Sequence, residues 1–228
     1  MQLGIPLSVR KFKEEANVLR GLLDFVDVFL VGDEDVSSLF GCGFELVCHL
    51  PELDGKSFEA LEQSRQLMAG KAVVHFHTRS QMTFEEKTQT LRRLQRGTAE
   101  RGIDLCLENT EETVEALKSV FMAVPELRFC LDVGHANLFS NSLLDFIRIF
   151  RDRLEHLHIS DNRGGNAEKD DLHLPPGEGS VDFPSIFSML KKLGYDGTIT
   201  LELHPRFDVD VKAESLRWLR DRLGTAGT

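Results

Sequence analysis

Short apolar runs alternate with longer segments of helical period along the whole chain. The short runs have the length of buried strands, and the longer ones place apolar residues every three or four positions. Strands are expected at 3–8, 25–31, 44–50, 72–77, 104–110, 128–135, 154–161 and 198–204. Helices are expected at 11–23, 57–69, 83–102, 113–124, 143–154, 184–194 and 211–223. This alternation predicts repeated βα units, and eight of them predict a single (β/α)8 TIM barrel of the α/β class.

Composition agrees with one globular unit. The chain has 228 residues, of which 41% are hydrophobic and 28% charged, and no Pro/Gly/Ser-rich linker divides it, so one barrel domain over residues 1–228 is expected. Neither a leader pattern nor a long apolar span is visible, which favours a cytoplasmic protein without a membrane partner. The four cysteines form no CxxC pair and are expected to be free thiols. The net charge of -10 disfavours a nucleic-acid partner without removing it.

Polar residues end nearly every predicted strand. In a barrel of this class, the carboxyl ends of the strands form the face that carries the chemistry. The candidates are His49, His75, Glu108, Asp132, His135, His158 and Glu202, with Asp171 and His173 in the loop after the seventh strand. Clustered carboxylates repel one another unless a cation lies among them, and mixed carboxylate and imidazole donors suit Zn, Mn, Fe, Co or Mg. The pattern predicts a divalent-metal site with one ion expected and two or three possible.

Five segments also carry a family resemblance. They are LENT (107–110), DVGH (132–135), HLHISDN (156–162), DLHLPPGEGSVDF (171–183) and GYDGTITLELHP (194–205). Together they resemble the xylose isomerase-like TIM barrel superfamily, which includes sugar-phosphate isomerases and epimerases and the endonuclease IV type of abasic-site nuclease. The isomerase branch implies that Glu108, Asp132, His158 and Glu202 bind one ion, with His135 close to the substrate. The endonuclease IV branch implies a multi-metal centre that also uses His49, His75, His135, Asp171 and His173.

Two features speak against the nuclease. After His49 the chain reads LPELDG, with no Tyr to enter a base stack, and the loop VGDEDVSS (31–38) is acidic where a phosphate-binding loop needs Arg or Lys. The leading prediction is therefore a metal-dependent sugar or sugar-phosphate isomerase or epimerase. A multi-metal phosphoesterase is the alternative, and a non-catalytic barrel is the third.

The leading prediction assigns roles to particular residues. Glu108 and Glu202 would transfer protons through an enediolate, with His135 as a further catalytic group. His204, Arg206 and Lys169 are candidates for binding a polyhydroxy or phosphorylated substrate. His77 and His156 are expected to point away from the site toward the helices. The sequence specifies no oligomeric state.

Overall fold

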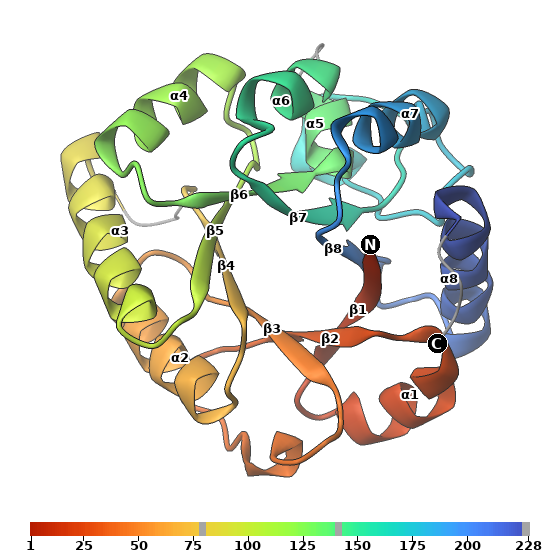
Figure 1. Ribbon diagram of the computed structural model, residues 1–228, viewed down its shortest axis with the longest axis horizontal. Helices are drawn as coiled ribbons and strands as arrows, with labels where there is room; N and C mark the ends of the chain where they lie inside the picture. The colour runs from red at the N-terminus through yellow and green to blue at the C-terminus, as the bar shows by residue number, and fades with distance from the viewer. Residues whose placement is uncertain (78–80, 140–142, 225–228) are drawn as a thin grey trace.

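Eight parallel strands close into a barrel in which each strand pairs with its neighbours in chain order. The computed structural model describes residues 1–77, 81–139 and 143–224. Helices surround the barrel on its outside (Figure 1). The strands are β1 (Gln2–Ser8), β2 (Phe25–Phe29), β3 (Glu45–His49), β4 (Lys71–His75), β5 (Asp104–Glu108), β6 (Arg128–Asp132), β7 (Leu154–Ile159) and β8 (Thr198–Leu201). The predicted (β/α)8 fold is confirmed.

The helices begin where the sequence supplies capping groups. At α3, Thr83 accepts a hydrogen bond from the Glu86 amide, and the Glu86 carboxylate accepts one from the Thr83 amide. Asp208 caps α8 in a similar way. The helices are α1 (Phe12–Leu19), α2 (Gly55–Gln66), α3 (Phe84–Ala99), α4 (Val114–Ala123), α5 (Val133–Phe139), α6 (Leu143–Phe150), α7 (Phe183–Leu193) and α8 (Val209–Leu223), with 3-10 turns at Arg20–Leu22, Ser37–Leu39 and Glu168–Asp170.

Apolar side chains fill the lower part of the barrel interior. They form a small cluster made of Phe25, Val47, Val73, Cys106 and Cys130. Gly4 makes room for the Phe25 ring, because a Cβ at Gly4 would lie 2.5 Å from it. The opposite faces of the strands pack against the helices in the main core. These side chains pack the interior beneath the carboxyl ends of the strands.

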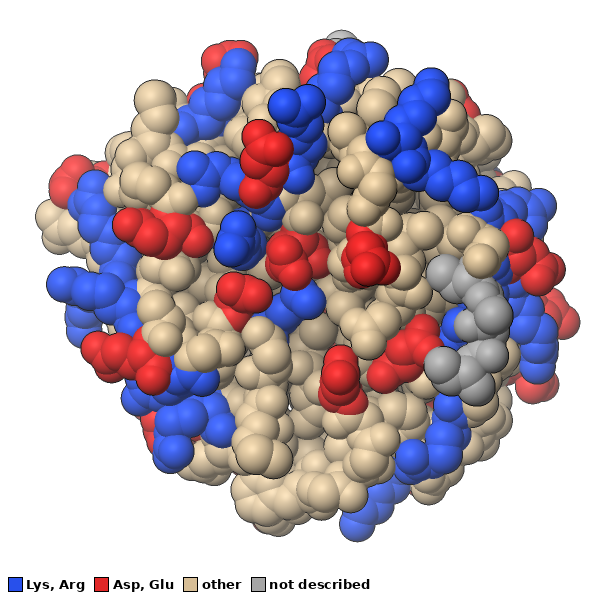
Figure 2. All heavy atoms as spheres, viewed as in Figure 1, with Lys and Arg blue, Asp and Glu red and all other residues tan. Residues whose placement is uncertain are grey.

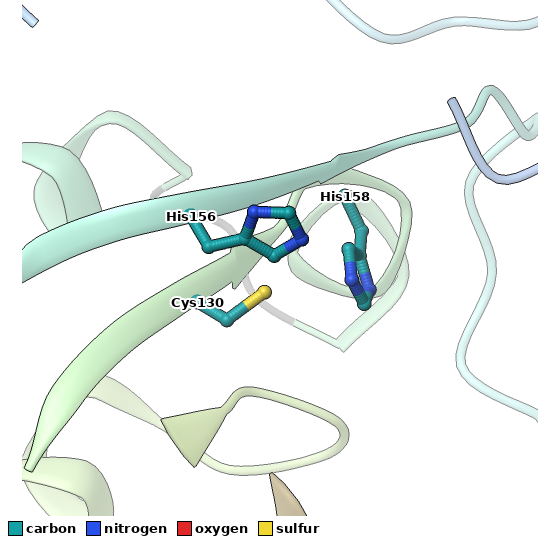
Figure 3. A group of neighbouring side chains, drawn as sticks. All are labelled: Cys130, His156 and His158. Carbon is teal, nitrogen blue, oxygen red and sulfur yellow. The ribbon is translucent and has the colours of Figure 1, made fainter. Parts of the chain in front are cut away.

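Two local expectations were wrong. The DVGH segment does not continue the sixth strand: β6 ends at Asp132, whose Oδ1 accepts a hydrogen bond from the His135 amide at 2.6 Å as α5 begins. His156 does not point toward the helices, since residues two apart on a strand share a face. It points into the barrel on the same side of β7 as His158 (Figure 3). His77 likewise lines a pocket together with His75.

The outer surface is charged but mixed. On the face shown in Figure 2, basic and acidic side chains are interspersed around the rim. The four cysteines are free thiols, as expected, and Trp218 packs between Phe183 and Phe187. Among the described residues, none of the helices combines the length and apolar character needed to cross a bilayer.

Candidate metal centre

Four predicted donors meet at the carboxyl ends of β5 to β8. One ligand atom from each of Glu108, Asp132, His158 and Glu202 lies within 4.8 Å of the others. Strand register causes this meeting, because Asp132 pairs with His158 across β6 and β7. His158 Nδ1 lies 3.2 Å from Glu202 Oε2, 3.3 Å from Glu108 Oε1 and 3.9 Å from Asp132 Oδ2. We call these four residues the central cluster.

A second group of donors adjoins the central cluster through Glu108. His75 pairs with Glu108 in the register of β4 and β5, and its Nε2 lies 3.0 Å from Glu108 Oε2. His49 Nε2 lies 3.1 Å from His75 Nε2 and 3.6 Å from the same carboxylate oxygen. His49, His75 and Glu108 form the β3–β5 cluster, whose three ligand atoms also lie within 4.8 Å of one another.

A third group lies on the other side of the mouth. His135 Nε2 is 3.3 Å and His173 Nε2 is 2.9 Å from Asp171 Oδ2. The Nδ1 atoms face backbone carbonyls, that of His135 toward Asn109 O and that of His173 toward Glu202 O, each at 3.1 Å. An imidazole that donates Nδ1–H to a carbonyl presents Nε2 as a lone-pair donor. These three residues, the loop cluster, are therefore oriented as metal ligands are.

Unpartnered buried atoms show that the site fits a cation. Asp132 Oδ2, His158 Nδ1 and Asp171 Oδ1 are buried and have no hydrogen-bond partner among the described residues. Leaving buried carboxylate oxygens unpaired is costly, and a divalent ion would compensate them. The donor set of carboxylates and imidazoles is one that zinc, manganese, iron and cobalt accept.

Protons replace the cation when no metal is bound. Burial opposes the charge of His158, but the carboxylates of Glu108, Glu202 and Asp27 raise its pKa well above its usual value. Burial also lowers the pKa of His135, but Asp132, Asp171 and Glu108 outweigh it and raise that pKa well above normal. Asp132 behaves differently: burial and the nearby Glu108 and Glu202 raise its pKa to about 6 despite His135 and His158. Metal binding at this centre would therefore release protons.

A cavity of about 300 Å³ opens beside the central cluster. Glu202, His173 and His204 lie on one side, and Phe29 lies on another. Lys11 and Lys212 also line the cavity, and both pair with Glu15. The predicted substrate residue His204 is thus at the cavity. Arg206 is exposed over the Phe207 ring, and Lys169 lies on the exposed turn Glu168–Asp170; neither lines this cavity.

The sequence reading missed residues that support the donors. Asn109 holds the end of β6, because its Nδ2 donates to Asp132 O and its Oδ1 accepts from Asp132 N, both at 2.9 Å. Asp27, in the middle of β2, is fully buried below the central cluster. An acid inside an otherwise apolar strand was the available signal for Asp27. The sequence gave no signal for the cavity residues Lys11 and Lys212, because α1 and α8 lie at opposite ends of the chain and meet only in the folded protein.

Comparison with known proteins decides the family. The model of the xylose isomerase-like TIM barrel family matches residues 40–222. The chain belongs to this family. The resemblance seen in the sequence motifs is confirmed.

Curated relatives of this family member match only in part. Over 106 residues it is 27% identical to an inosose dehydratase of Lacticaseibacillus casei, covering 40% of this chain and 36% of the relative. Over 111 residues it is 29% identical to the putative L-ribulose-5-phosphate 3-epimerase SgbU of Escherichia coli, covering 46% of this chain and 39% of the relative. The chain thus spans under two fifths of the length of these relatives.

Solved structures match over the whole fold. A D-tagatose 3-epimerase-like protein superimposes with a TM-score of 0.77 at 21% identity, covering 98% of this chain and 97% of that one. The TTHB071 protein of Thermus thermophilus, soaked with ZnCl2, gives 0.75 at 27% identity with both chains covered completely. Sugar epimerases and a protein solved with a bound zinc atom are also among the neighbours of this barrel.

Proposed function

We propose that this protein is a divalent-metal-dependent isomerase or epimerase of a sugar or sugar phosphate. The observation that carries the proposal is the central cluster, in which two carboxylates from β5 and the end of β8 converge with Asp132 and His158. The epimerases and isomerases named among its relatives support the same class. One ion of Mn, Zn, Co, Fe or Mg at these four residues is the expected complement.

The bound ion would polarise a substrate carbonyl and stabilise the negative charge of an enediolate. Glu108 and Glu202 come from opposite sides of His158, so their carboxylates can exchange protons with different faces of a substrate carbon. Glu202 also borders the cavity, so the substrate would extend from there toward Phe29 and His204. His135 has its Nδ1 fixed by Asn109 O and its Nε2 available for a substrate hydroxyl.

Solvent exchange tests the proton-transfer chemistry. Metal-loaded protein incubated with ketoses and ketose phosphates in deuterated water should incorporate deuterium at the carbon beside the carbonyl, as measured by NMR. Glu202→Gln should lower this rate at least about 100-fold, the scale of general acid–base catalysis. Glu115→Gln, on the outer helix α4 with an exposed side chain, should exchange like the unaltered protein. If no sugar exchanges deuterium at any metal loading, the isomerase proposal is wrong.

A second function is favoured by one specific observation. The β3–β5 cluster and the loop cluster supply donors that a one-metal isomerase does not need, and both lie against the central cluster through Glu108 and His135. Several adjacent divalent ions suit hydrolysis of a phosphoester, in which they bind the attacking and the leaving oxygens. A multi-metal phosphoesterase of the endonuclease IV type is therefore the second candidate.

Asp171→Asn separates the two candidates. Asp171 belongs to the loop cluster and not to the central one. For a one-metal isomerase, the substitution should leave one bound ion per chain, by elemental analysis, and measurable deuterium exchange. For a phosphoesterase, the unaltered protein should hold two or three ions and cleave a phosphodiester or abasic DNA. Asp171→Asn should then lose at least one ion together with the cleavage.

A further inference from the structure

Asp27 is a buried acid in a place that barrels usually fill with branched apolar side chains. It lies on β2 with no exposed surface. Thr200 Oγ1 donates a hydrogen bond to Asp27 Oδ2 at 3.1 Å, and the same oxygen faces His158 Nε2 at 3.4 Å and His156 Nε2 at 3.7 Å. A carboxylate kept in this position calls for a reason other than packing.

His158 lies between Asp27 and the three carboxylates of the central cluster. Its Nδ1 faces Glu108, Asp132 and Glu202, and its Nε2 faces Asp27 on the opposite side of the ring. Both ring nitrogens of His158, and Asp27 Oδ1, are buried without an aligned hydrogen-bond partner among the described residues. A neutral imidazole that gives Nδ1 to a metal must carry its proton on Nε2, where it needs an acceptor. Asp27 is the carboxylate on that side.

We propose that Asp27 is a positioning residue, which accepts a hydrogen bond from Nε2–H of His158 and thereby fixes Nδ1 as the metal donor of the central cluster. This inference rests on the metal site of the proposed function, but not on the reaction that occurs there. Thr200, through its hydroxyl, would hold the Asp27 carboxylate in place from β8.

The surrounding groups do not offer His158 a better arrangement. His156 lies beside His158 in Figure 3, but its Nδ1 is 2.6 Å from Thr198 Oγ1 and its Nε2 is 3.2 Å from Thr200 Oγ1. Cys130 stays a thiol, because burial raises its pKa far above the usual range. His49 is the remaining competitor, since Asp27, His49 and His158 could themselves surround a cation.

Asp27→Asn tests the proposal through zinc affinity. Asn keeps the size of the side chain and removes its charge, so the variant should fold with an unchanged circular dichroism spectrum. Chelator competition should show zinc binding about 10–100-fold weaker, with the number of ions per chain unchanged. The matched control is Thr198→Val, which touches His156 and not His158 and should bind zinc within about twofold of the unaltered protein.

The unaltered protein gives an independent readout. In zinc-loaded protein with 15N-labelled histidine, NMR should show His158 protonated on Nε2 and zinc on Nδ1. The opposite tautomer would overturn the proposal even if Asp27→Asn failed to fold. Unchanged zinc affinity in the Asp27→Asn variant would also overturn the proposal. Loss of one whole zinc ion, with the others bound as before, would overturn it too, because that result would make Asp27 a metal ligand beside His49. If the Asp27–His158 pair supports zinc binding as proposed but no sugar exchanges deuterium, only the isomerase function is refuted.

Discussion

Replacing Asp132 with Asn should make the metal-free protein more stable. Asp132 is fully buried, and its own burial together with Glu108 and Glu202 raises its pKa from 3.8 to about 6. A raised carboxyl pKa means that the folded state disfavours the charge, so stability is lost as the pH rises from about 4 to about 6. The charge of Asp132 therefore destabilises the metal-free protein until a cation is bound beside it.

The size of the effect follows from the pKa. Moving a carboxyl pKa from 3.8 to about 6 corresponds to about 3 kcal/mol at pH 7.5 and about 1 kcal/mol at pH 4.5. The neutral amide of the Asp132→Asn variant would not carry this cost. Its oxygen can still accept the hydrogen bond from the His135 amide, and its NH2 group can donate toward Glu108 or Glu202. The same substitution removes a charged donor from the metal site, so zinc should bind far more weakly.

Urea denaturation in EDTA measures this directly. Asp132→Asn should raise the free energy of unfolding by about 3 kcal/mol at pH 7.5 and by about 1 kcal/mol at pH 4.5. The matched control is Asp161→Asn, an equally buried acid that accepts hydrogen bonds from the amides of Asn162, Gly177, Gly179 and Val181. That variant should lose about 3 kcal/mol, because an amide cannot accept all four. A loss of stability in Asp132→Asn at pH 7.5, or an equal gain at both pH values, would refute the reasoning.

Three further predictions concern the whole protein. Zinc should raise Tm more at pH 9 than at pH 6. In the metal-free protein, burial lowers the pKa of His173, but Asp171 and Glu202 outweigh burial and raise that pKa to about 9. The stability that the His173 charge contributes is therefore complete below about pH 6.5 and is lost as the pH rises through about 9, so equal Tm shifts at the two pH values would contradict this prediction. Gly179→Ala should cost about 3 kcal/mol in urea denaturation, since its Cβ would lie 2.1 Å from Asn162 O, whereas Gly55→Ala, with open space, should cost nothing measurable. A thiol reagent should modify only Cys42 in the folded protein. Cys48, Cys106 and Cys130 should react only after unfolding, because these three thiols are buried. Rapid reaction of a second thiol in the folded protein would contradict the described barrel interior.

The strand ends were predictable because two simple rules locate them. Apolar runs of four to eight residues mark the strands, and parallel strands bring their carboxyl ends to one face. Glu108, Asp132 and His158 follow from these rules, and the register of β6 and β7 brings the latter two side by side. The start of α5 did not follow, because that helix has only seven residues and begins directly at the end of a strand.

The layer beneath the site was harder to predict. Asp27 lies between Val26 and Val28, and an isolated acid in an apolar run gives no indication of which residue it faces. Its partners Thr200 and His158 come from β8 and β7, so their meeting depends on closure of the barrel across the β1–β8 pair. His156 could have been placed correctly, since the two-residue period of a strand puts it on the face of His158.

Charge balance links the number of metal ions to the kind of substrate. The three clusters contain four carboxylates, those of Glu108, Asp132, Asp171 and Glu202, alongside five imidazoles that bind metals in the neutral form. One divalent ion offsets two of these four negative charges, and His135 and His173, whose pKa values are raised when no metal is bound beside them, offset the other two as imidazolium groups. The mouth then has no surplus positive charge to attract a phosphate, which suits an uncharged polyhydroxy substrate.

Three divalent ions, with all five imidazoles neutral as ligands, give the mouth a surplus of two positive charges, or one when Asp27 is included. Such a centre attracts a phosphoester and should be inhibited by inorganic phosphate. A one-ion centre should be indifferent to phosphate. Phosphate inhibition measured at increasing zinc loading therefore reports which chemistry the clusters perform, because only the multi-metal state has a charge for the anion to neutralise.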